Sequence, residues 1–253
     1  MVGIDLTGKV AIITGGSRGI GRATVLRFAE AGAIVVINYR SDYTAAQDLV
    51  KEVEETGGRA RAIQADVAVK DDVDRMVAET IKSFGQVDIL VNNAGIWEYN
   101  PIDKMTRESL HRTIDINLMG CFYTSMAVAP HMKKRRTGTI VYVSSTAGQR
   151  GEAFHSPYAA TKGALISLTK SLAPELVKEN IRVNCVAPGW AETDMTVPTL
   201  SGPEAKDVIS KIPMGRVAAP EEMANAILFI ASDLASFITG EILNVNGGAV
   251  LCG

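Results

Sequence analysis

Tyr158 and Lys162 are the two side chains whose spacing first suggests chemistry. They stand four residues apart in the stretch SPYAATKGALISLTKSL, which otherwise holds mainly small and apolar residues. Four residues make about one helical turn, so the phenol and the ammonium would share one face of a helix. A nearby cation lowers the pKa of a phenol and lets it exchange a proton near neutral pH. The alternative is a tyrosine that packs on a lysine stem.

A glycine-rich turn near the N-terminus has the spacing to hold a phosphate. The stretch TGGSRGIG at 14–21 follows a β-branched run and precedes a helical pattern. Gly15 would let the chain turn sharply, while Gly19 and Gly21 would leave room for a pyrophosphate and a neighbouring backbone. The free N–H groups of the following helix would bind that anion. We therefore predict a dinucleotide site, with ordinary turn glycines as the alternative.

The elements that must position these residues alternate between strands and helices. We predict strands at 9–14, 33–38, 59–67, 87–95, 138–145, 181–188 and 241–248, and helices at 19–31, 44–58, 70–85, 110–136, 156–179 and 220–232. Alternation with buried apolar strands predicts a parallel sheet covered on both faces. No linker or repeat divides the chain, so we expect one domain, 1–253, with the irregular segment 189–217 as a mobile substrate lid.

Several polar residues directly follow the predicted strands. Ligands bind beyond the carboxyl ends of the strands in open parallel sheets, so these positions are candidates for ligand contact. Polar residues also begin ordinary loops, but here many of them share one edge. They are Tyr39 and Arg40, Asp66, Asn92 and Asn93, and Ser144 and Ser145, and the sixth strand runs into Pro188 and Gly189.

Composition argues against several other classes of protein. The net charge is −2 and the lysines and arginines are scattered, so we expect no nucleic-acid partner. Three cysteines without metal-ligand spacing favour a reducing cytoplasm, and Cys121, Cys185 and Cys252 are expected to be small apolar fillers. We also expect no metal site, no signal peptide and no membrane partner.

The chain resembles the short-chain dehydrogenase/reductase family from end to end. The matching stretches, in order, are TGxxxGxG at 14–21, NNAG at 92–95, DINLMG with Asn117, VSSTAG with Ser145, YAATK at 158–162, and PG at 188–189 followed by Thr193. Within the family, IRVNCVAPGWAETDM and ITGEILNVNGG are similar to 3-oxoacyl-acyl-carrier-protein reductases. The resemblance implies a Rossmann-type, doubly wound sheet of seven parallel strands.

The resemblance also implies a role for each catalytic candidate. Tyr158 would be the general acid in reduction and the base in oxidation. Lys162, with the oxidised nicotinamide, would lower the phenol pKa by ~3 units, which corresponds to ~4 kcal/mol. Ser145 would hold the carbonyl oxygen as charge develops. Asn117 would hold a water that links Lys162 to solvent, and Thr193 would bond the nicotinamide carboxamide.

The second strand is followed by features that favour NADP(H) over NAD(H). NAD sites usually place an acidic residue there, whereas this chain has Tyr39 and then Arg40, with Arg18 inside the glycine turn. Two guanidiniums suit a 2′-phosphate, although both could simply be solvated. The expected cofactor-binding residues are Gly15, Ser17, Arg18, Gly19, Ile20, Gly21, Arg40, Asp66, Val67, Asn93, Gly95, Tyr158, Lys162 and Thr193.

The leading activity implied is reduction of a ketone to a secondary alcohol, above all of a 3-oxoacyl thioester or ester. Alternatives are a sugar, steroid or other secondary-alcohol dehydrogenase on the same scaffold, and a non-catalytic dinucleotide-binding regulator. Besides Ser145, we expect Trp97, Phe154 and Trp190 to line the substrate pocket, with core packing as the alternative. His155 is expected to be a loop residue without a role.

The resemblance implies a homotetramer and a docking site for acyl carrier protein. Related reductases dock that acidic partner with two basic side chains near the mouth of the active site. The matching positions hold Arg136 and Glu179, so one charge is reversed. A reversed rim charge weakens electrostatic steering, and we therefore expect carrier-protein docking to be weak.

Overall fold

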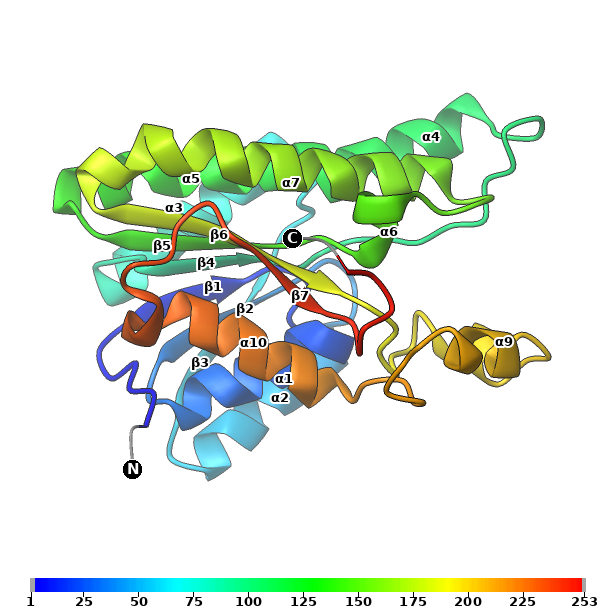
Figure 1. Cartoon of the computed structure of the whole chain (residues 1–253). Helices are drawn as coiled ribbons and strands as arrows, with labels where there is room; N and C mark the ends of the chain where they lie inside the picture. The colour runs from blue at the N-terminus through cyan, green and yellow to red at the C-terminus, as the bar shows by residue number, and fades with distance from the viewer. Residues whose placement is uncertain (1–2, 252–253) are drawn as a thin grey trace.

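Seven parallel strands form one sheet in the order β3-β2-β1-β4-β5-β6-β7 (Figure 1). The computed structural model describes residues 3–251. The strand order reverses between β1 and β4, which is the arrangement of a doubly wound Rossmann-type sheet. The predicted fold class is therefore confirmed. The strands are β1 (Val10–Ile13), β2 (Ile34–Tyr39), β3 (Arg59–Gln64), β4 (Ile89–Asn92), β5 (Gly138–Val143), β6 (Ile181–Pro188) and β7 (Ile242–Val245).

Helices cover both faces of the sheet. In Figure 1, α3, α5 and α7 lie above it and α1, α2 and α10 lie below it. Four-residue α8 and six-residue α9 lie in the segment after β6. The helices are α1 (Gly19–Glu30), α2 (Tyr43–Glu55), α3 (Lys70–Phe84), α4 (Arg107–Ile114), α5 (Gly120–Arg135), α6 (Thr146–Arg150), α7 (Ser156–Leu176), α8 (Val197–Leu200), α9 (Ala205–Ser210) and α10 (Pro220–Ala231).

Two apolar cores follow from the alternation of side chains along each strand. In β1, Val10 and Ile12 join the core that also contains Val128 of α5 and Leu165 of α7. Ala11 and Ile13 point the other way, into the core that holds side chains of α1 and α10. The inner strands therefore bury both of their faces, which explains why they read as continuous apolar runs, whereas β3 and β7 at the edges of the sheet are more exposed.

The predicted helix at 110–136 is interrupted where the site requires it. It consists of α4, a π-helical turn (Asp115–Met119) and α5. The single wide turn carries Asn117 and changes the direction in which that side chain points. Sequence periodicity could not locate such a turn, because the apolar pattern continues on both sides of it.

Most other differences lie at the carboxyl ends of the strands. β3, β4 and β7 end three residues earlier than the predicted strands, at Gln64, Asn92 and Val245. The residues that leave the sheet at these ends are free to form ligand-binding turns. Helix α6 was not predicted, and the segment 189–217 contains α8 and α9 rather than being wholly irregular. Its mobility stays a prediction.

Among residues 3–251, no helix is long and apolar enough to cross a bilayer. In the same part of the chain, no cluster of three or more histidine, cysteine or acidic side chains could hold a metal ion. Cys121 and Cys185 are buried free thiols, in agreement with their expected role as fillers. Cys252 lies outside the described residues.

Candidate active site

Tyr158 and Lys162 lie in the first two turns of α7, where they share one face as predicted. The Lys162 ammonium lies 5.7 Å from the centroid of the Tyr158 ring. Lys162 is only 4% exposed, and its Nζ donates a hydrogen bond of 2.7 Å to the carbonyl oxygen of Val143, the last residue of β5. The lysine is therefore fixed between the helix and the end of the strand.

The phenol of Tyr158 is held in its protonated form. Burial raises its pKa to about 12; the Ser145 hydroxyl partly offsets this rise, and the Glu152 carboxylate adds to it. Burial likewise lowers the pKa of Lys162. In the chain alone desolvation is the largest cause of the shift, and the predicted lowering, which included the oxidised nicotinamide, stays a prediction. A neutral phenol at pH 7 is the state that a proton donor requires.

The two serines after β5 make different contacts. Ser144 is buried and its Oγ donates to the carbonyl oxygen of Lys162 at 2.7 Å, so it ties β5 to α7. Ser145 is partly exposed and caps α6, where its Oγ accepts from the amide of Ala147 at 3.1 Å. Its hydroxyl also lowers the pKa of Tyr158, so the two side chains act on each other.

Asn117 joins the chain after β4 to α7. Its Oδ1 accepts from the amide of Ile96 at 2.8 Å, and its Nδ2 donates to the Ile96 carbonyl at 2.9 Å. The side chain is fully buried, and a Cβ added to Gly95 would lie 3.2 Å from Asn117 Oδ1 and 3.5 Å from Lys162 Nζ. Asn117, Gly95 and Lys162 are therefore neighbours, although the water expected between lysine and solvent stays a prediction.

The glycine turn has the shape of a phosphate cradle. Gly15 and Gly19 have φ of 60° and 54°, which favour glycine, and a Cβ at Gly21 would lie 2.1 Å from the Gly15 carbonyl oxygen. Asn93 braces the turn, because its Nδ2 donates to the carbonyl oxygens of Thr14 at 2.9 Å and Gly15 at 3.2 Å. The first amides of α1 have no carbonyl partners within the helix, so they can bind a pyrophosphate.

Other predicted cofactor residues border this cradle. Ser17 and Ile20 are partly exposed within the turn, and Val67 is buried against α5, where a Cβ on Gly120 would lie 3.0 Å from its side chain. Thr193 also reaches the cradle, since a Cβ on Gly19 would lie 3.4 Å from the threonine side chain. The beginning of the segment 189–217 therefore contacts the glycine turn.

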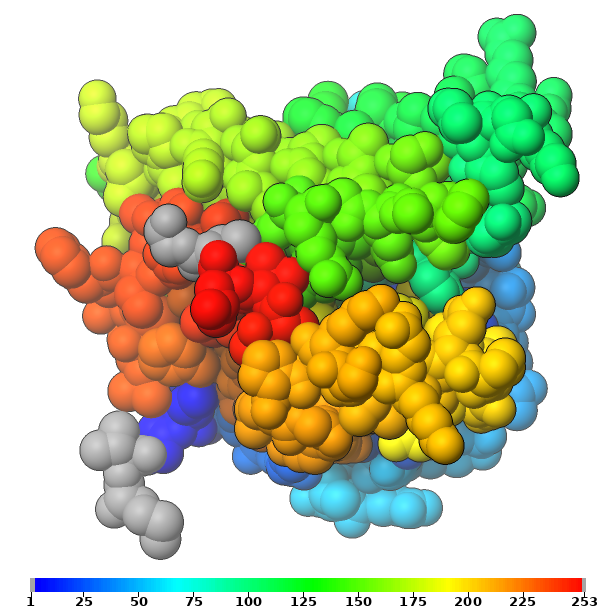
Figure 2. All heavy atoms as spheres, turned by 45° about the vertical axis from the view of Figure 1, so that its right-hand side comes forward, coloured from blue at the N-terminus to red at the C-terminus, as the bar shows by residue number. Residues whose placement is uncertain are grey.

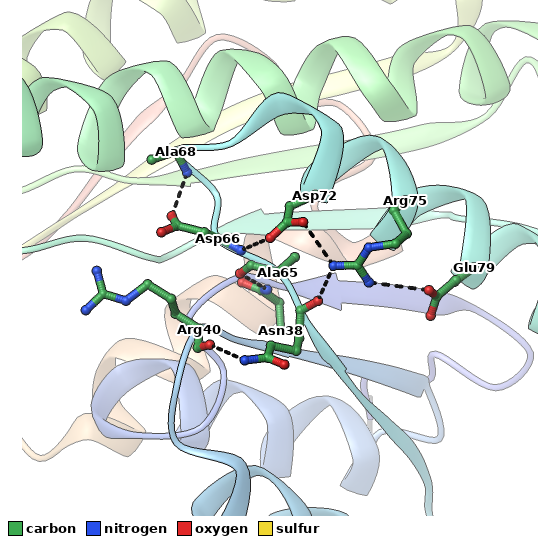
Figure 3. A network of polar contacts seen from close by, with 9 residues as sticks. Asn38, Arg40, Ala65, Asp66, Ala68, Asp72, Arg75 and Glu79 are labelled. Carbon is green, nitrogen blue, oxygen red and sulfur yellow. Dashed lines mark hydrogen bonds and ion pairs between the residues drawn. The ribbon is translucent and has the colours of Figure 1, made fainter.

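The ends of β2 and β3 carry the groups expected around an adenosine (Figure 3). Asp66 Oδ1 accepts from the amide of Ala68 at 2.9 Å, which leaves the other carboxylate oxygen for a ligand. Arg75 bonds Asp72 and the Gln64 carbonyl, and the guanidinium of Arg40 points away from that network in Figure 3. Arg40 and Arg18 are both exposed, and neither has an ion-pair partner among residues 3–251. The observed groups fit a nicotinamide dinucleotide.

Aromatic side chains line one side of the site. Trp97 and Trp190 meet edge to face with ring centroids 5.8 Å apart, so two predicted pocket residues come together. Phe154, the third, is 58% exposed and stacks on Tyr99 at 5.6 Å. His155, expected to have no role, stacks on Trp97 at 4.4 Å. Sequence reasoning missed Tyr99 and His155, although each stands beside a predicted pocket residue.

Arg136 and Glu179 do not flank this site within the chain. Arg136 precedes β5 and Glu179 precedes β6, so both lie at the amino ends of the strands, opposite Tyr158 (Figure 1). They also bond each other at 2.8 Å, and Arg136 donates a second bond to the Lys178 carbonyl. The expectation that these positions lie near the mouth of the active site is therefore wrong within one chain. Weak docking of acyl carrier protein stays a prediction.

Comparison with known proteins agrees with this geometry. A family model described as enoyl-(acyl carrier protein) reductase matches residues 15–250. The chain is 42% identical to a 3-oxoacyl-[acyl-carrier-protein] reductase of Synechocystis sp. over 247 residues, which cover 97% of this chain and 98% of that one. A 3-oxoacyl-[acyl-carrier-protein] reductase of Thermotoga maritima is also 42% identical, over 97% of this chain and 99% of its own. The chain belongs to the short-chain dehydrogenase/reductase family.

Solved structures of the family show the same fold. The crystal structure of gox2181 superposes with a TM-score of 0.94 at 36% identity and covers 97% of this chain and 96% of its own. A dehydrogenase/reductase from Sinorhizobium meliloti has a TM-score of 0.92 at 35% identity, over 98% of this chain and 97% of its own. As a member of this family, the chain is an oxidoreductase of CH–OH groups that uses a nicotinamide dinucleotide.

Proposed function

We propose that this enzyme reduces a 3-oxoacyl ester or thioester to the 3-hydroxy product, with NADPH as the electron donor and Tyr158 as the proton donor. The observation that supports it best is the half-buried Tyr158 phenol near Ser145, with Lys162 one turn further along α7 and 5.7 Å from the ring centroid. The substrate class follows the names of the relatives from Synechocystis and Thermotoga. The exposed, unpaired Arg18 and Arg40 support NADPH rather than NADH.

In this mechanism Ser145 donates a hydrogen bond to the ketone oxygen and holds it against Tyr158. The bound nicotinamide supplies the hydride. As negative charge develops on the oxygen, Tyr158 donates its proton, and the buried Lys162 ammonium stabilises the phenolate that remains. Asn117 fixes the backbone beside Lys162 and so keeps the lysine in reach of the nicotinamide ribose.

Replacement of Tyr158 by Phe tests the proposal, because it removes only the hydroxyl. General-acid catalysis contributes about 10²–10⁴-fold, so we expect kcat for a small β-keto ester to fall by about that factor. The affinity for NADPH, measured by quenching of protein fluorescence, should change little. Tyr123→Phe is the matched control, since Tyr123 lies on α5 outside the site. Turnover of Tyr158→Phe equal to that of the unaltered enzyme would show that another group donates the proton.

A further inference from the structure

Five aromatic rings form a continuous wall at the mouth of the site. Each ring contacts the next in the order Trp190, Trp97, His155, Tyr99 and Phe154, with centroid separations of 5.8, 4.4, 5.9 and 5.6 Å. We call this set the aromatic wall. Its members come from three segments that are distant in sequence: the chain after β4, the turn before α7, and the chain after β6.

The wall lies beside the catalytic groups. His155 stands three residues before Tyr158, at the start of α7. Trp97 directly follows Ile96, whose backbone is bonded by Asn117. A ketone held between Ser145 and Tyr158 would therefore have one of its substituents against these rings.

Hydrogen bonds hold the wall in place. Trp97 Nε1 donates to Glu152 Oε2 at 3.2 Å, and the amide of Asn100 donates to the Phe154 carbonyl at 2.6 Å. The chain after β4 is thereby tied to the turn before α7. A rigid wall of rings favours a planar ligand over a flexible one. The planar ligand loses little conformational freedom when it binds.

The outer end of the wall leaves two rings largely open to solvent. Tyr99 is 67% exposed and Phe154 is 58% exposed. At the inner end, Trp190 borders a hollow together with Ile212 and Met214 of the segment 189–217, which forms the gold ridge in the foreground of Figure 2; Arg216 and Glu222 also line this hollow. Accessible aromatic rings beside a catalytic site favour the binding of an apolar group against them.

A cationic substituent fits this wall less well. Cation–π recognition needs an open ring face, and one face of Trp97 is covered by His155, which stacks on it at an interplanar angle of 11°. Glu152, the nearby carboxylate, already accepts the Trp97 hydrogen bond. A neutral planar ring can instead stack on Trp190 or meet the other rings edge to face.

We propose that the enzyme is selective for 3-oxo esters or thioesters whose acyl chain carries an aromatic ring, and that the aromatic wall binds that ring. The inference rests on the proposed function, since it names the substrate class of the same site. Straight-chain acyl groups would gain only the apolar contact and not the preferred ring–ring geometry.

The test compares two esters that differ only in the planarity of a ring. They are ethyl 3-oxo-4-phenylbutanoate and ethyl 4-cyclohexyl-3-oxobutanoate, in which a methylene separates the ring from the ketone. We expect kcat/KM with NADPH to be about tenfold higher for the phenyl ester, the size of one good aromatic contact. Trp190→Leu should bring the ratio of the two esters close to one, whereas Trp190→Phe, which keeps a ring, should retain most of it.

A ratio that is the same in the unaltered enzyme and in Trp190→Leu and Trp97→Leu would overturn the inference. Failure of the proposed function gives a different result, namely that neither ester is reduced. In that case binding still tests the wall, because Trp97 and Trp190 are the only two tryptophans of the chain. Ethyl 3-hydroxy-4-phenylbutanoate should quench their fluorescence in the NADP⁺-loaded protein at lower concentration than the cyclohexyl analogue; equal quenching would contradict the inference.

Discussion

Glu152 interacts both with Trp97 of the aromatic wall and with Tyr158. Its carboxylate accepts the hydrogen bond from Trp97 and also contributes to the raised pKa of Tyr158. A negative charge near a phenol disfavours the phenolate, so Glu152 helps keep Tyr158 protonated. Glu152 therefore holds the proton on Tyr158, and donation in the proposed reduction depends on stabilisation of the phenolate by the Lys162 ammonium.

Replacement of Glu152 by Gln should shift the pH dependence of the reverse reaction. The amide can still accept the Trp97 hydrogen bond, but the charge that raises the Tyr158 pKa is gone. The phenolate needed for oxidation then forms at lower pH. The pH at which the oxidation rate rises should therefore be lower in the variant. We expect a fraction of a pH unit, because Glu152 contributes less than burial.

The measurement is the pH–rate profile for oxidation of a 3-hydroxy ester with NADP⁺. Glu175→Gln serves as the control, since Glu175 lies near the far end of α7. A profile of Glu152→Gln that moves to higher pH, or does not move, would show that the carboxylate does not act on Tyr158.

Arg40 offers a second prediction at the scale of a single residue. A charge-assisted hydrogen bond contributes about 1.5–3 kcal/mol, so Arg40→Ala should weaken NADPH binding by roughly tenfold to a hundredfold. NADH binding should change little, because NADH lacks the 2′-phosphate. Arg59→Ala is the control, since Arg59 is exposed at the amino end of β3. A higher kcat/KM with NADH than with NADPH in the unaltered enzyme would overturn the cofactor assignment.

Residue positions were more predictable than residue environments. The spacing of Tyr158 and Lys162 located them on one helical face, and the glycine spacing located the cradle. The raised pKa of Tyr158 in the chain alone could not be predicted, because burial depends on side chains that are distant in sequence. The stack of His155 on Trp97 was missed for the same reason, since 58 residues separate the two along the chain.

At the scale of elements, the far end of the segment 189–217 is joined to α10 by an ion pair, in addition to backbone bonds such as that of Met214 to Gly247. Both terminal guanidinium nitrogens of Arg216 donate to Glu222, at 2.6 and 2.8 Å, and Glu222 Oε2 also accepts from the amide of Ala219. Glu222 is at the start of α10, where a carboxylate caps the helix and suits its dipole. The segment is thereby joined to a helix that packs on the sheet.

Loss of this pair should loosen the segment in a pH-dependent way. The Arg216 hydrogen bonds, followed by the Ala219 amide, lower the pKa of Glu222 from 4.5 to about 2. A depressed folded-state pKa gives stabilisation that is fully present above the unfolded value and is lost as pH falls through the folded value. The contribution of the pair is therefore complete above about pH 4.5 and disappears towards pH 2.

Limited proteolysis of Glu222→Gln tests this. At pH 7 the variant should be cut faster than the unaltered enzyme within 189–217, and the difference in unfolding free energy should shrink below pH 4.5. Glu221→Gln is the matched control, because Glu221 is in the same turn without the Arg216 bonds. A difference that grows as the pH falls would contradict the linkage.

Element types were predicted better than element boundaries. The strand patterns identified all seven strands of the sheet, most clearly the inner ones, which are buried on both faces. The π-helical turn at Asp115–Met119 has no signature in the apolar pattern, since it is stabilised by the bonds of Asn117 to Ile96. Helix α6 was not predicted from the sequence because it is only five residues long.

At the scale of the whole molecule, α5 presents an apolar face that the single chain leaves uncovered. Phe122 is 38% exposed and Met126 is 55% exposed, and the two stand one helical turn apart. Apolar side chains at this spacing on an outer helix are suited to packing against a second helix. The resemblance to the family implied a homotetramer, and we expect this face of α5 to lie in one of its interfaces.

The last prediction is therefore that Met126→Glu weakens the assembly. A carboxylate placed in an apolar interface must be desolvated without a partner, which disfavours association strongly. Light scattering at micromolar concentration should give four times the 27.0 kDa chain mass for the unaltered enzyme and a smaller assembly for Met126→Glu. Val69→Glu adds the same charge at an exposed apolar residue before α3 and should leave the mass unchanged. A monomeric unaltered enzyme would refute the tetramer, whereas a tetrameric Met126→Glu would show that α5 lies outside its interfaces.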